Sequence, residues 1–267
     1  MHNKYHELTE IIKGYGRLAV AFSNGIDSTF LLKTAHDVLG DGVLAITVDA
    51  PNFPSEEAEE AKKYCESLGV RHVVINYDIL SLEQFSSNPP DRCYYCKKAL
   101  FSEIVKVASE NGIDVVADGS NADDMSDIRP GMKALGELSI KSPLMEAGLA
   151  KSDIRALAKE QGVTIWDKPA FACLASRIAF GEEITEDKLG MIEDAEEYIR
   201  EFGVRQIRVR MHDSMARIET LPTEFDEIMA HKDEIYARLQ EMGFTYVSLD
   251  LQGYRTGSMN EGSVSKD

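Results

Sequence analysis

The first half of the chain alternates short apolar runs with stretches of helical periodicity, and this alternation restricts the fold more than any other feature. The apolar runs are 17–22, 43–48, 72–77 and 114–119. Helical patterns follow the first three of them, at 28–39, 55–69 and from residue 96 onward. Strands that alternate with helices in this way are typical of a parallel, doubly wound α/β sheet. Ligands of such sheets bind beyond the carboxyl ends of the strands.

The second half has a different pattern. It consists of a helical stretch at 185–202, alternating strands at 206–212 and 215–220, a helical stretch at 224–242 and a strand at 246–251. This order predicts a small α+β unit. We therefore expect two domains: residues 1–165 form the α/β domain, and residues 166–267 form a smaller α+β domain for substrate binding or oligomerisation.

Composition excludes several classes of partner. No apolar run approaches the length that spans a bilayer, and the amphipathic start lacks the apolar core of a signal peptide, so a cytoplasmic protein without membrane contact is expected. The formal net charge is −17. A nucleic-acid-binding surface needs a basic face, and none is visible, so the charge favours a small-molecule substrate.

The first apolar run ends in the turn Ser-Asn-Gly-Ile-Asp-Ser, residues 23–28. A strand, a tight turn and a helix direct backbone N–H groups at phosphate. Gly25 would let the backbone approach the ligand, and Ser23 and Ser28 would add hydroxyl donors. Asp27 suits an anion site only where a cation such as Mg²⁺ bridges it to the phosphates. The spacing lacks the Gly-Lys-Ser/Thr ending of a Walker A loop.

Cys93 and Cys96 are separated by two residues, in a chain with four cysteines. In a reducing compartment such a pair indicates half of a zinc site, a redox dithiol or two ligands of an iron–sulfur cluster. Residues three apart at the start of a helix lie on one face, and no histidine nearby completes a zinc site. Cys173 lies between Lys168 and Arg177, whose positive charge would favour its thiolate.

The turn at 23–28 resembles the PP-loop, Ser-Gly-Gly-x-Asp-Ser, of ATP pyrophosphatases. Asn24 replaces a glycine of that motif, and asparagine tolerates positive φ better than most residues. The resemblance implies that ATP, with Mg²⁺, is bound by the loop residues Ser23, Asn24, Gly25, Asp27 and Ser28.

Five further stretches, at 118–134, 142–162, 166–181, 207–219 and 249–261, together resemble the LarE family. The resemblance covers nearly the whole chain. It implies a PP-loop fold and the activity of a sulfur transferase in the synthesis of the nickel-pincer nucleotide. That nucleotide is the cofactor of lactate racemase. ATP would adenylate each carboxylate of a pyridinium biscarboxylic acid mononucleotide, and a sulfur nucleophile would then displace AMP to leave a thiocarboxylate.

The family has two forms that differ in the source of sulfur. In one form only the cysteine matching Cys173 is present; it gives up its own sulfur and becomes dehydroalanine. In the other, three cysteines hold a [4Fe-4S] cluster whose open iron carries a sulfide. This chain has all three, so the resemblance implies cluster ligation by Cys93, Cys96 and Cys173, with an external sulfide donor. The sacrificial cysteine, a tRNA thiolase and a non-enzymatic metal carrier remain alternatives.

The resemblance also implies roles for charged residues. Arg208 and Arg210 alternate along a strand, so they share a face, and their guanidinium forks suit the substrate phosphate. Arg177 would neutralise the adenylate or substrate, and Glu196 would bind a metal or orient the substrate. Cys173, Asp27, Arg177 and Glu196 are thus the expected residues of the reaction, in a homo-oligomer.

Overall fold

The computed structural model describes residues 1–126, 130–167, 173–255 and 257–260, which form two compact units. The first unit contains residues 1–50, 55–78 and 93–167. The second contains 51–54, 79–92 and the described residues from 173 onward. Two short segments of the first half of the chain therefore belong to the second unit.

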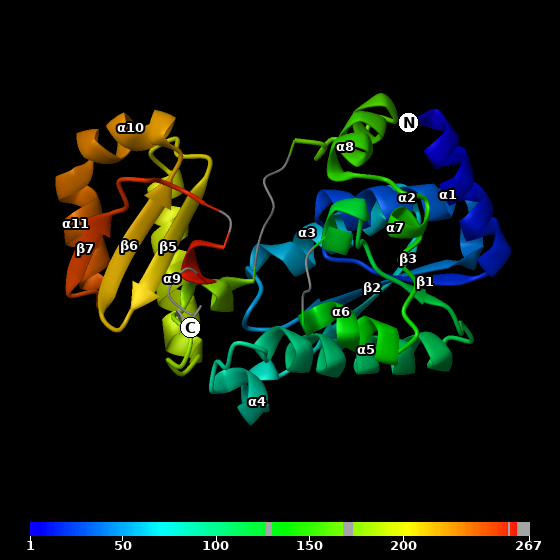
Figure 1. Cartoon of the computed structure of the whole chain (residues 1–267), viewed down its shortest axis with the longest axis horizontal. Helices are drawn as coiled ribbons and strands as arrows, with labels where there is room; N and C mark the ends of the chain where they lie inside the picture. Colours follow the sequence, from blue (N-terminus) through cyan, green and yellow to red (C-terminus); the bar gives the residue numbers. More distant parts are fainter. Residues whose placement is uncertain (127–129, 168–172, 256, 261–267) are drawn as a thin grey trace. The chain divides into compact units, whose positions relative to one another are not determined.

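The first unit is built on a four-stranded parallel sheet, which confirms the predicted α/β fold (Figure 1). The strands are β1 (Leu18–Ala21), β2 (Val43–Asp49), β3 (Arg71–Asn76) and β4 (Val116–Ala117), in the order β3-β2-β1-β4. β4 is shorter than the predicted run 114–119, because only two of its residues pair with β1. The order reverses between β1 and β4, so the loops that follow these two strands lie at the topological switch point.

The helices of this unit follow the predicted alternation. They are α1 (His2–Tyr15), α2 (Ile26–Leu39), α3 (Glu56–Leu68), α5 (Arg92–Glu110), α6 (Pro130–Glu137), α7 (Pro143–Glu146) and α8 (Lys151–Glu160). α2 begins inside the predicted turn 23–28, because Gly25 is its N-cap and the Gly25 carbonyl accepts the Thr29 N–H at 2.9 Å. α5 begins at Arg92, ahead of the predicted start at Cys96.

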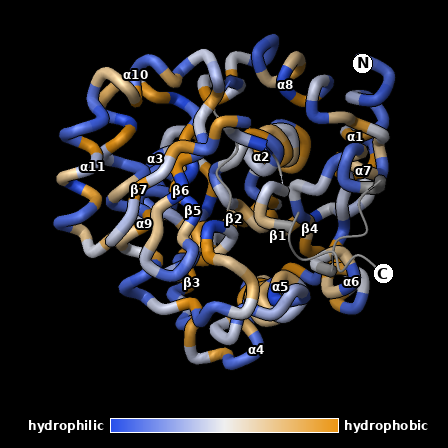
Figure 2. Tube along the Cα trace, turned by 60° about the vertical axis from the view of Figure 1, so that its left-hand side comes forward, coloured by the Kyte–Doolittle hydropathy of each residue, from blue (hydrophilic) through white to orange (hydrophobic). Residues whose placement is uncertain are grey.

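The apolar runs are continuous because the two central strands are covered on both faces. On one face Val20 packs with Phe30 of α2. On the other, Ala19 and Leu44 pack with Ile104 of α5. Figure 2 shows hydrophobic segments along α2. A strand buried on both faces needs an apolar residue at nearly every position, which explains why these strands do not alternate.

The second unit contains a three-stranded mixed sheet. β5 (Ile207–His212) pairs antiparallel with β6 (Met215–Thr220), and β6 pairs parallel with β7 (Tyr246–Leu249). Its helices are α4 (Glu83–Ser86), α9 (Glu186–Arg200), α10 (Phe225–Ala230) and α11 (Lys232–Glu241). A smaller α+β unit was predicted, and the mixed sheet with its helices confirms it.

The prediction of one helix over 224–242 was wrong. His231 separates α10 from α11, with φ −110° and ψ 16°. Its ring stacks on that of Phe202, with centroids 4.3 Å apart. A helical periodicity that continues across such a break cannot reveal it, because the stacking partner lies on another element.

No helix within 1–126, 130–167, 173–255 and 257–260 is long and apolar enough to cross a membrane.

Candidate functional site

The loop after β1 has the conformation that its sequence requires. Asn24 adopts φ 53°, in the left-handed region, and its amide Nδ2 donates to Glu60 of α3 at 2.9 Å. The two loop hydroxyls, of Ser23 and Ser28, lie 3.1 Å apart, and the Ser28 hydroxyl also donates to the Gly25 carbonyl. The loop is thus a tight strand–helix connection that places the start of α2 beyond the end of β1, the arrangement that suits phosphate.

Asp27 lies on the first turn of α2 and carries the charge of the site. Its Oδ2 accepts a hydrogen bond from Lys151 Nζ at 3.1 Å and lies 3.5 Å from Asn121 Nδ2. Its Oδ1 is buried and has no hydrogen-bond partner among the described residues. Burial raises the pKa of Asp27, and the Lys151 ammonium opposes that rise. A carboxylate with one unpartnered buried oxygen at a helix start fits a Mg²⁺ ligand beside phosphates.

The loop after β4 packs directly on the loop after β1. A Cβ added to Gly119 would lie 2.9 Å from the Ser28 backbone nitrogen, so only glycine allows this approach. Beside it, both carboxylate oxygens of Asp118 accept hydrogen bonds, from the hydroxyls of Ser120 and Ser142. Asn121 caps the short 3₁₀ helix Ala122–Ser126 by accepting the Asp123 N–H. Two loops far apart in the sequence therefore form one wall.

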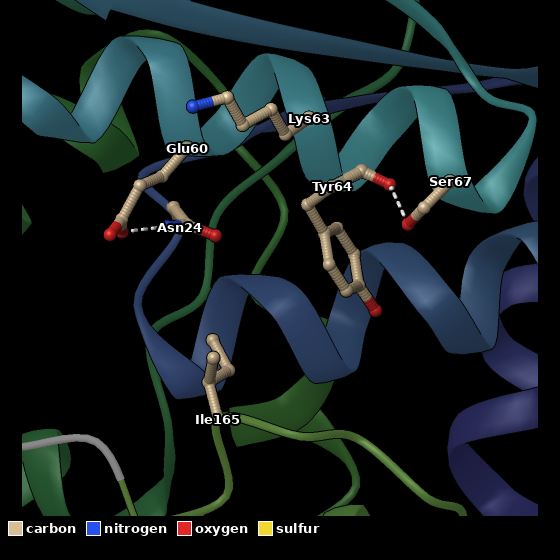
Figure 3. A pocket seen from close by; sticks show the side chains of 6 residues that line it. All are labelled: Asn24, Glu60, Lys63, Tyr64, Ser67 and Ile165. Carbon is tan, nitrogen blue, oxygen red and sulfur yellow. Dashed lines mark hydrogen bonds between the residues drawn. The ribbon is translucent and has the colours of Figure 1, made fainter.

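A pocket of about 350 Å³ lies beside the loop, between Asn24 and α3 (Figure 3). It is lined by Asn24, Glu60, Lys63, Tyr64, Ser67 and Ile165. Burial raises the pKa of Tyr64 to about 12, so its hydroxyl stays protonated and can donate. The Asn24 side chain points to Glu60 of α3, as Figure 3 shows. The side chain that replaces the glycine of the motif is thus held by α3.

Substitution of Asn24 tests whether its backbone conformation is what matters. Asn24→Gly is expected to change the free energy of unfolding by less than about 1 kcal/mol, because glycine adopts positive φ freely. Asn24→Val is expected to destabilise by about 1–3 kcal/mol, because a β-branched residue is strained there. Urea unfolding measures both. Equal losses for the two variants would contradict this account.

In the second unit, Cys173 is held from both sides. Asn52, which is fully buried, donates from Nδ2 to the Cys173 Sγ at 3.2 Å, and its backbone oxygen accepts the Leu174 N–H at 2.8 Å. Arg177 donates to the Cys173 carbonyl at 3.0 Å. The Cys173 sulfur thus serves as the acceptor of a side-chain N–H, and the backbone on both sides of it is fixed. Lys168, the second positive charge expected near Cys173, lies outside the described residues.

Arg177 and Glu196 form a buried, bidentate ion pair. Arg177 Nε and Nη2 donate to the two Glu196 carboxylate oxygens at 2.9 and 3.1 Å, and the two residues are 0% and 1% exposed. Glu196 also accepts from Arg200 and from the Val209 N–H. Burial alone would raise the pKa of Glu196, but the guanidinium of Arg177 and that of Arg208 hold it below its usual value. Glu196 thus orients Arg177 and anchors β5; a direct action on metal or substrate stays a prediction.

Arg208 and Arg210 of β5 are both buried, at 4% and 5% exposure, so they do not lie on a solvent-exposed strand face. Arg210 pairs with Glu219 of β6 at 3.0 Å. The Arg208 guanidinium lies 5.5 Å from the centre of the Tyr254 ring. Burial and the neighbouring Arg177 lower the pKa of Arg208 to about 10, which leaves it charged at neutral pH.

The C-terminal segment contacts the strands that carry these arginines. The Ser258 hydroxyl donates to Glu219, whose carboxylate also accepts from Arg217 at 2.9 Å. In the described part of the second unit the arginines 177, 200, 208, 210 and 217 accompany three carboxylates: the two fully buried glutamates, 196 and 219, and Asp250, which lies 3.7 Å from Arg217. An arginine excess of this kind is a local positive site in an acidic chain, which is what an anionic ligand requires.

The cysteines differ sharply in exposure. Cys93 is exposed and Cys96 is half-buried, both within the first five residues of α5 in the first unit, whereas Cys173 is half-buried in the second. Cys65, on the core-facing side of α3, is fully buried, and burial raises its pKa to about 12. Within the described ranges, no three His, Cys, Asp or Glu side chains are grouped as a metal site.

Thiol labelling checks this ranking. In metal-free reduced protein, iodoacetamide at neutral pH is expected to modify Cys93 within minutes and to leave Cys65 unmodified until denaturant is added, because the buried thiol is protonated and inaccessible. Mass spectrometry of the peptides measures both. Early labelling of Cys65 in the folded chain would contradict the packing of α3.

The structure reveals site residues that the sequence did not single out: Lys151, Asn52 and Glu219. Lys151 lies in the stretch 142–162, which contributed to the family resemblance, but the sequence assigned no function to any residue of that stretch. Asn52 gave no signal, because it meets Cys173 only through the fold. Glu219 could have been found: it lies in the predicted strand 215–220, opposite Arg208 in the β5–β6 pair.

Comparison with known proteins indicates independently which family the chain is related to. The chain is 40% identical over 255 residues to the pyridinium-3,5-bisthiocarboxylic acid mononucleotide synthase of Lactiplantibacillus plantarum, which covers 95% of this chain and 92% of that protein. It is 37% identical over 262 residues to an uncharacterised protein of Synechocystis, covering 97% and 98%.

A weaker likeness extends to other enzymes. The chain is 26% identical over 190 residues to a tRNA-specific 2-thiouridylase of Rickettsia rickettsii, covering 57% of this chain and 52% of that protein. No family model matches the chain.

Proposed function

Because the chain belongs to the LarE family of ATP-dependent PP-loop sulfur transferases, we propose that it converts the carboxylates of pyridinium-3,5-biscarboxylic acid mononucleotide to thiocarboxylates. The geometry that carries the proposal is the loop after β1. It joins the start of α2 to the switch point of the sheet and places there a half-buried carboxylate, Asp27, with one buried and unpartnered oxygen among the described residues. A nucleotide triphosphate with its cation is the ligand that such a site fits.

ATP is proposed to bind with its phosphates on the backbone of residues 23–28. Ser23 and Ser28 would turn their hydroxyls, now 3.1 Å from each other, to phosphate oxygens. Asp27 would hold Mg²⁺ through its unpartnered Oδ1, and the ion would neutralise the phosphates beside it. A substrate carboxylate oxygen then attacks the α-phosphorus, pyrophosphate leaves with the bridging oxygen, and an acyl adenylate forms.

Sulfur then attacks the activated carbonyl carbon, the bond to the AMP oxygen breaks, and a thiocarboxylate remains. We propose that Cys93, Cys96 and Cys173 together hold a [4Fe-4S] cluster. The exposed and half-buried state of all three thiols, against the fully buried Cys65, supports this set. Such a cluster would supply an open iron that carries the transferred sulfide. Reloading requires an external sulfide donor.

The substrate phosphate is proposed to bind at Arg208 and Arg210, whose guanidinium groups lie in the arginine-rich group of β5 and β6. Burial strengthens such charges, because water does not screen them. Glu196 and Glu219 keep that group folded without cancelling its positive charge. Residues 1–165 would thus serve the nucleotide and residues 166–267 the substrate. Homo-oligomeric assembly stays a prediction.

The decisive experiment supplies anaerobically reconstituted protein with ATP, Mg²⁺ and the pyridinium mononucleotide. Pyrophosphate release and a product heavier by the exchange of oxygen for sulfur are expected together. Pyrophosphate release only with tRNA would instead favour a tRNA thiolase. If none of the substrates tested led to pyrophosphate release, a non-enzymatic metal carrier would be favoured.

Iron and acid-labile sulfide decide the source of sulfur. Each of Cys93→Ala, Cys96→Ala and Cys173→Ala is expected to lose the cluster, and Cys65→Ala, the matched control, to keep it. An iron-free wild type whose Cys173 becomes dehydroalanine after one turnover would replace the cluster with the sacrificial cysteine.

A further inference from the structure

Asn52 is a polar residue in a fully buried position, and its side chain contacts the sulfur of Cys173. It lies in the segment 51–54, which follows β2 in the chain but belongs to the second unit. Its exposure is 0%, and its amide Nδ2 donates to Cys173 Sγ at 3.2 Å. Its backbone oxygen accepts the Leu174 N–H at 2.8 Å. Asn52 thus holds both the side chain of Cys173 and the backbone of the next residue.

The backbone that carries this amide has little freedom. Pro51 precedes Asn52 and Pro54 follows two residues later, and each proline ring fixes its own φ at about −65°. The Asn52 side chain is fully buried, so the close packing around it also restricts its rotamer. A donor on such a support keeps one position relative to the sulfur, which is what the orientation of a ligand requires.

The oxygen of the same amide is the feature that packing does not explain. Asn52 Oδ1 is buried and has no hydrogen-bond partner among the described residues. An unpartnered buried acceptor costs stability, and most buried polar atoms in folded proteins have a partner. Leucine has nearly the same size and would fill the position without that cost. The contact that an asparagine offers here and a leucine does not is the N–H donated to sulfur.

The orientation of the amide fits one chemical state of the sulfur. Asparagine offers two donors on Nδ2 and one acceptor oxygen, and a thiol can both donate and accept. A thiolate bound to iron has no proton, so it can only accept. Nδ2 faces Cys173, and Oδ1, the atom to which a thiol S–H would donate, accepts no hydrogen bond from a described residue. The amide is therefore oriented as a thiolate ligand requires.

We propose that Asn52 is a positioning residue of the sulfur site, whose Nδ2 donates to the Cys173 sulfur when that residue ligates the cluster. The inference rests on the proposed cluster and adds to it a residue outside the cysteines. A hydrogen bond to a cluster thiolate withdraws negative charge from the sulfur and favours the more electron-rich state, so it raises the reduction potential. The same bond fixes the side chain of Cys173, whose sulfur thereby keeps its place for iron.

Asn52→Leu tests this role, because it keeps the volume and removes both the donor and the unpartnered acceptor. In metal-free protein the urea midpoint of this variant is expected to equal or exceed that of wild type, since losing a bond to sulfur is offset by losing the unpartnered oxygen. In anaerobically reconstituted protein the reduction potential, followed by electron paramagnetic resonance, is expected to fall by about 30–60 mV. That shift is a three- to tenfold change in a one-electron equilibrium.

Asn111→Leu is the matched control. Asn111 is a half-buried asparagine just after α5, and its Nδ2 donates to the Val107 carbonyl at 2.9 Å. Its loss should leave the potential unchanged. Loss of iron from Asn52→Leu but not from Asn111→Leu, with the metal-free urea midpoint retained, would also support the inference.

An unchanged potential in fully loaded Asn52→Leu would overturn the inference alone. If the urea midpoint of the metal-free variant then also fell, the amide would have a structural role instead. An iron-free wild type that still forms thiocarboxylate would overturn the cluster and this inference but not the proposed activity. A wild type that holds the cluster and shows the expected shift, yet forms no thiocarboxylate, would keep the inference and overturn the activity.

Discussion

Asp27→Asn is expected to slow pyrophosphate release by about 10²- to 10³-fold while the protein becomes no less stable. The amide keeps the shape of the carboxylate but offers a poor ligand to Mg²⁺. Because burial raises the pKa of Asp27, the ionised carboxylate is a cost to folding at neutral pH. That cost is absent below the ordinary pKa and grows as the pH rises through the raised value. The melting temperature at pH 7 should therefore stay constant or rise.

The matched control is Asp37→Asn. Asp37 lies on the same helix in a solvent-exposed pair with Lys33, and its loss should alter neither rate nor stability by more than about 1 kcal/mol. Steady-state pyrophosphate release and thermal melts measure the two variants. A variant Asp27→Asn that retains full activity would remove Asp27 from the reaction.

Glu196→Ala is expected to destabilise the protein by about 3–5 kcal/mol. The substitution leaves the guanidinium of Arg177, which is fully buried, without its bidentate partner, and it also removes the acceptor of the Val209 N–H. Urea unfolding measures the loss. Glu241→Ala, which breaks an exposed pair with Arg238, is the control and should cost less than about 1 kcal/mol.

The double variant Arg177→Met with Glu196→Leu tests the cause. Removing both charges should be less destabilising than Glu196→Ala, because the buried guanidinium of Arg177 is removed together with its bidentate partner. The pH adds a second check. Since the folded-state pKa of Glu196 is lowered from 4.5, its contribution is present above that value and is lost as the pH falls through the lowered one. The stability difference between wild type and Glu196→Gln should therefore shrink in acid. A difference that is constant down to pH 2 would contradict the pairing.

Local sequence patterns predicted the helices and strands well where contacts between residues close together in the chain determine the secondary structure. The run at 43–48 became β2 with similar bounds, because burial on both faces of a central strand requires consecutive apolar residues. The run at 72–77 became β3, an edge strand of half-buried and exposed residues. The helix at 224–242 failed, because the stacking of His231 on Phe202 is a tertiary contact. The start of α2 failed by two residues, since the capping role of Gly25 competes with its role as a turn residue.

The sequence by itself determined the parallel sheet, the mixed second unit, the phosphate loop with a residue that accepts positive φ at position 24, and the family. These follow from periodicity and from residues close together in the chain. Only the tertiary structure decided that Lys151 meets Asp27 across 124 residues, that Asn52 meets Cys173 across 121, and that residues 79–92 join the second unit. Such contacts depend on how helices, strands and loops far apart in the chain pack together, and this packing leaves no periodic pattern in the local sequence.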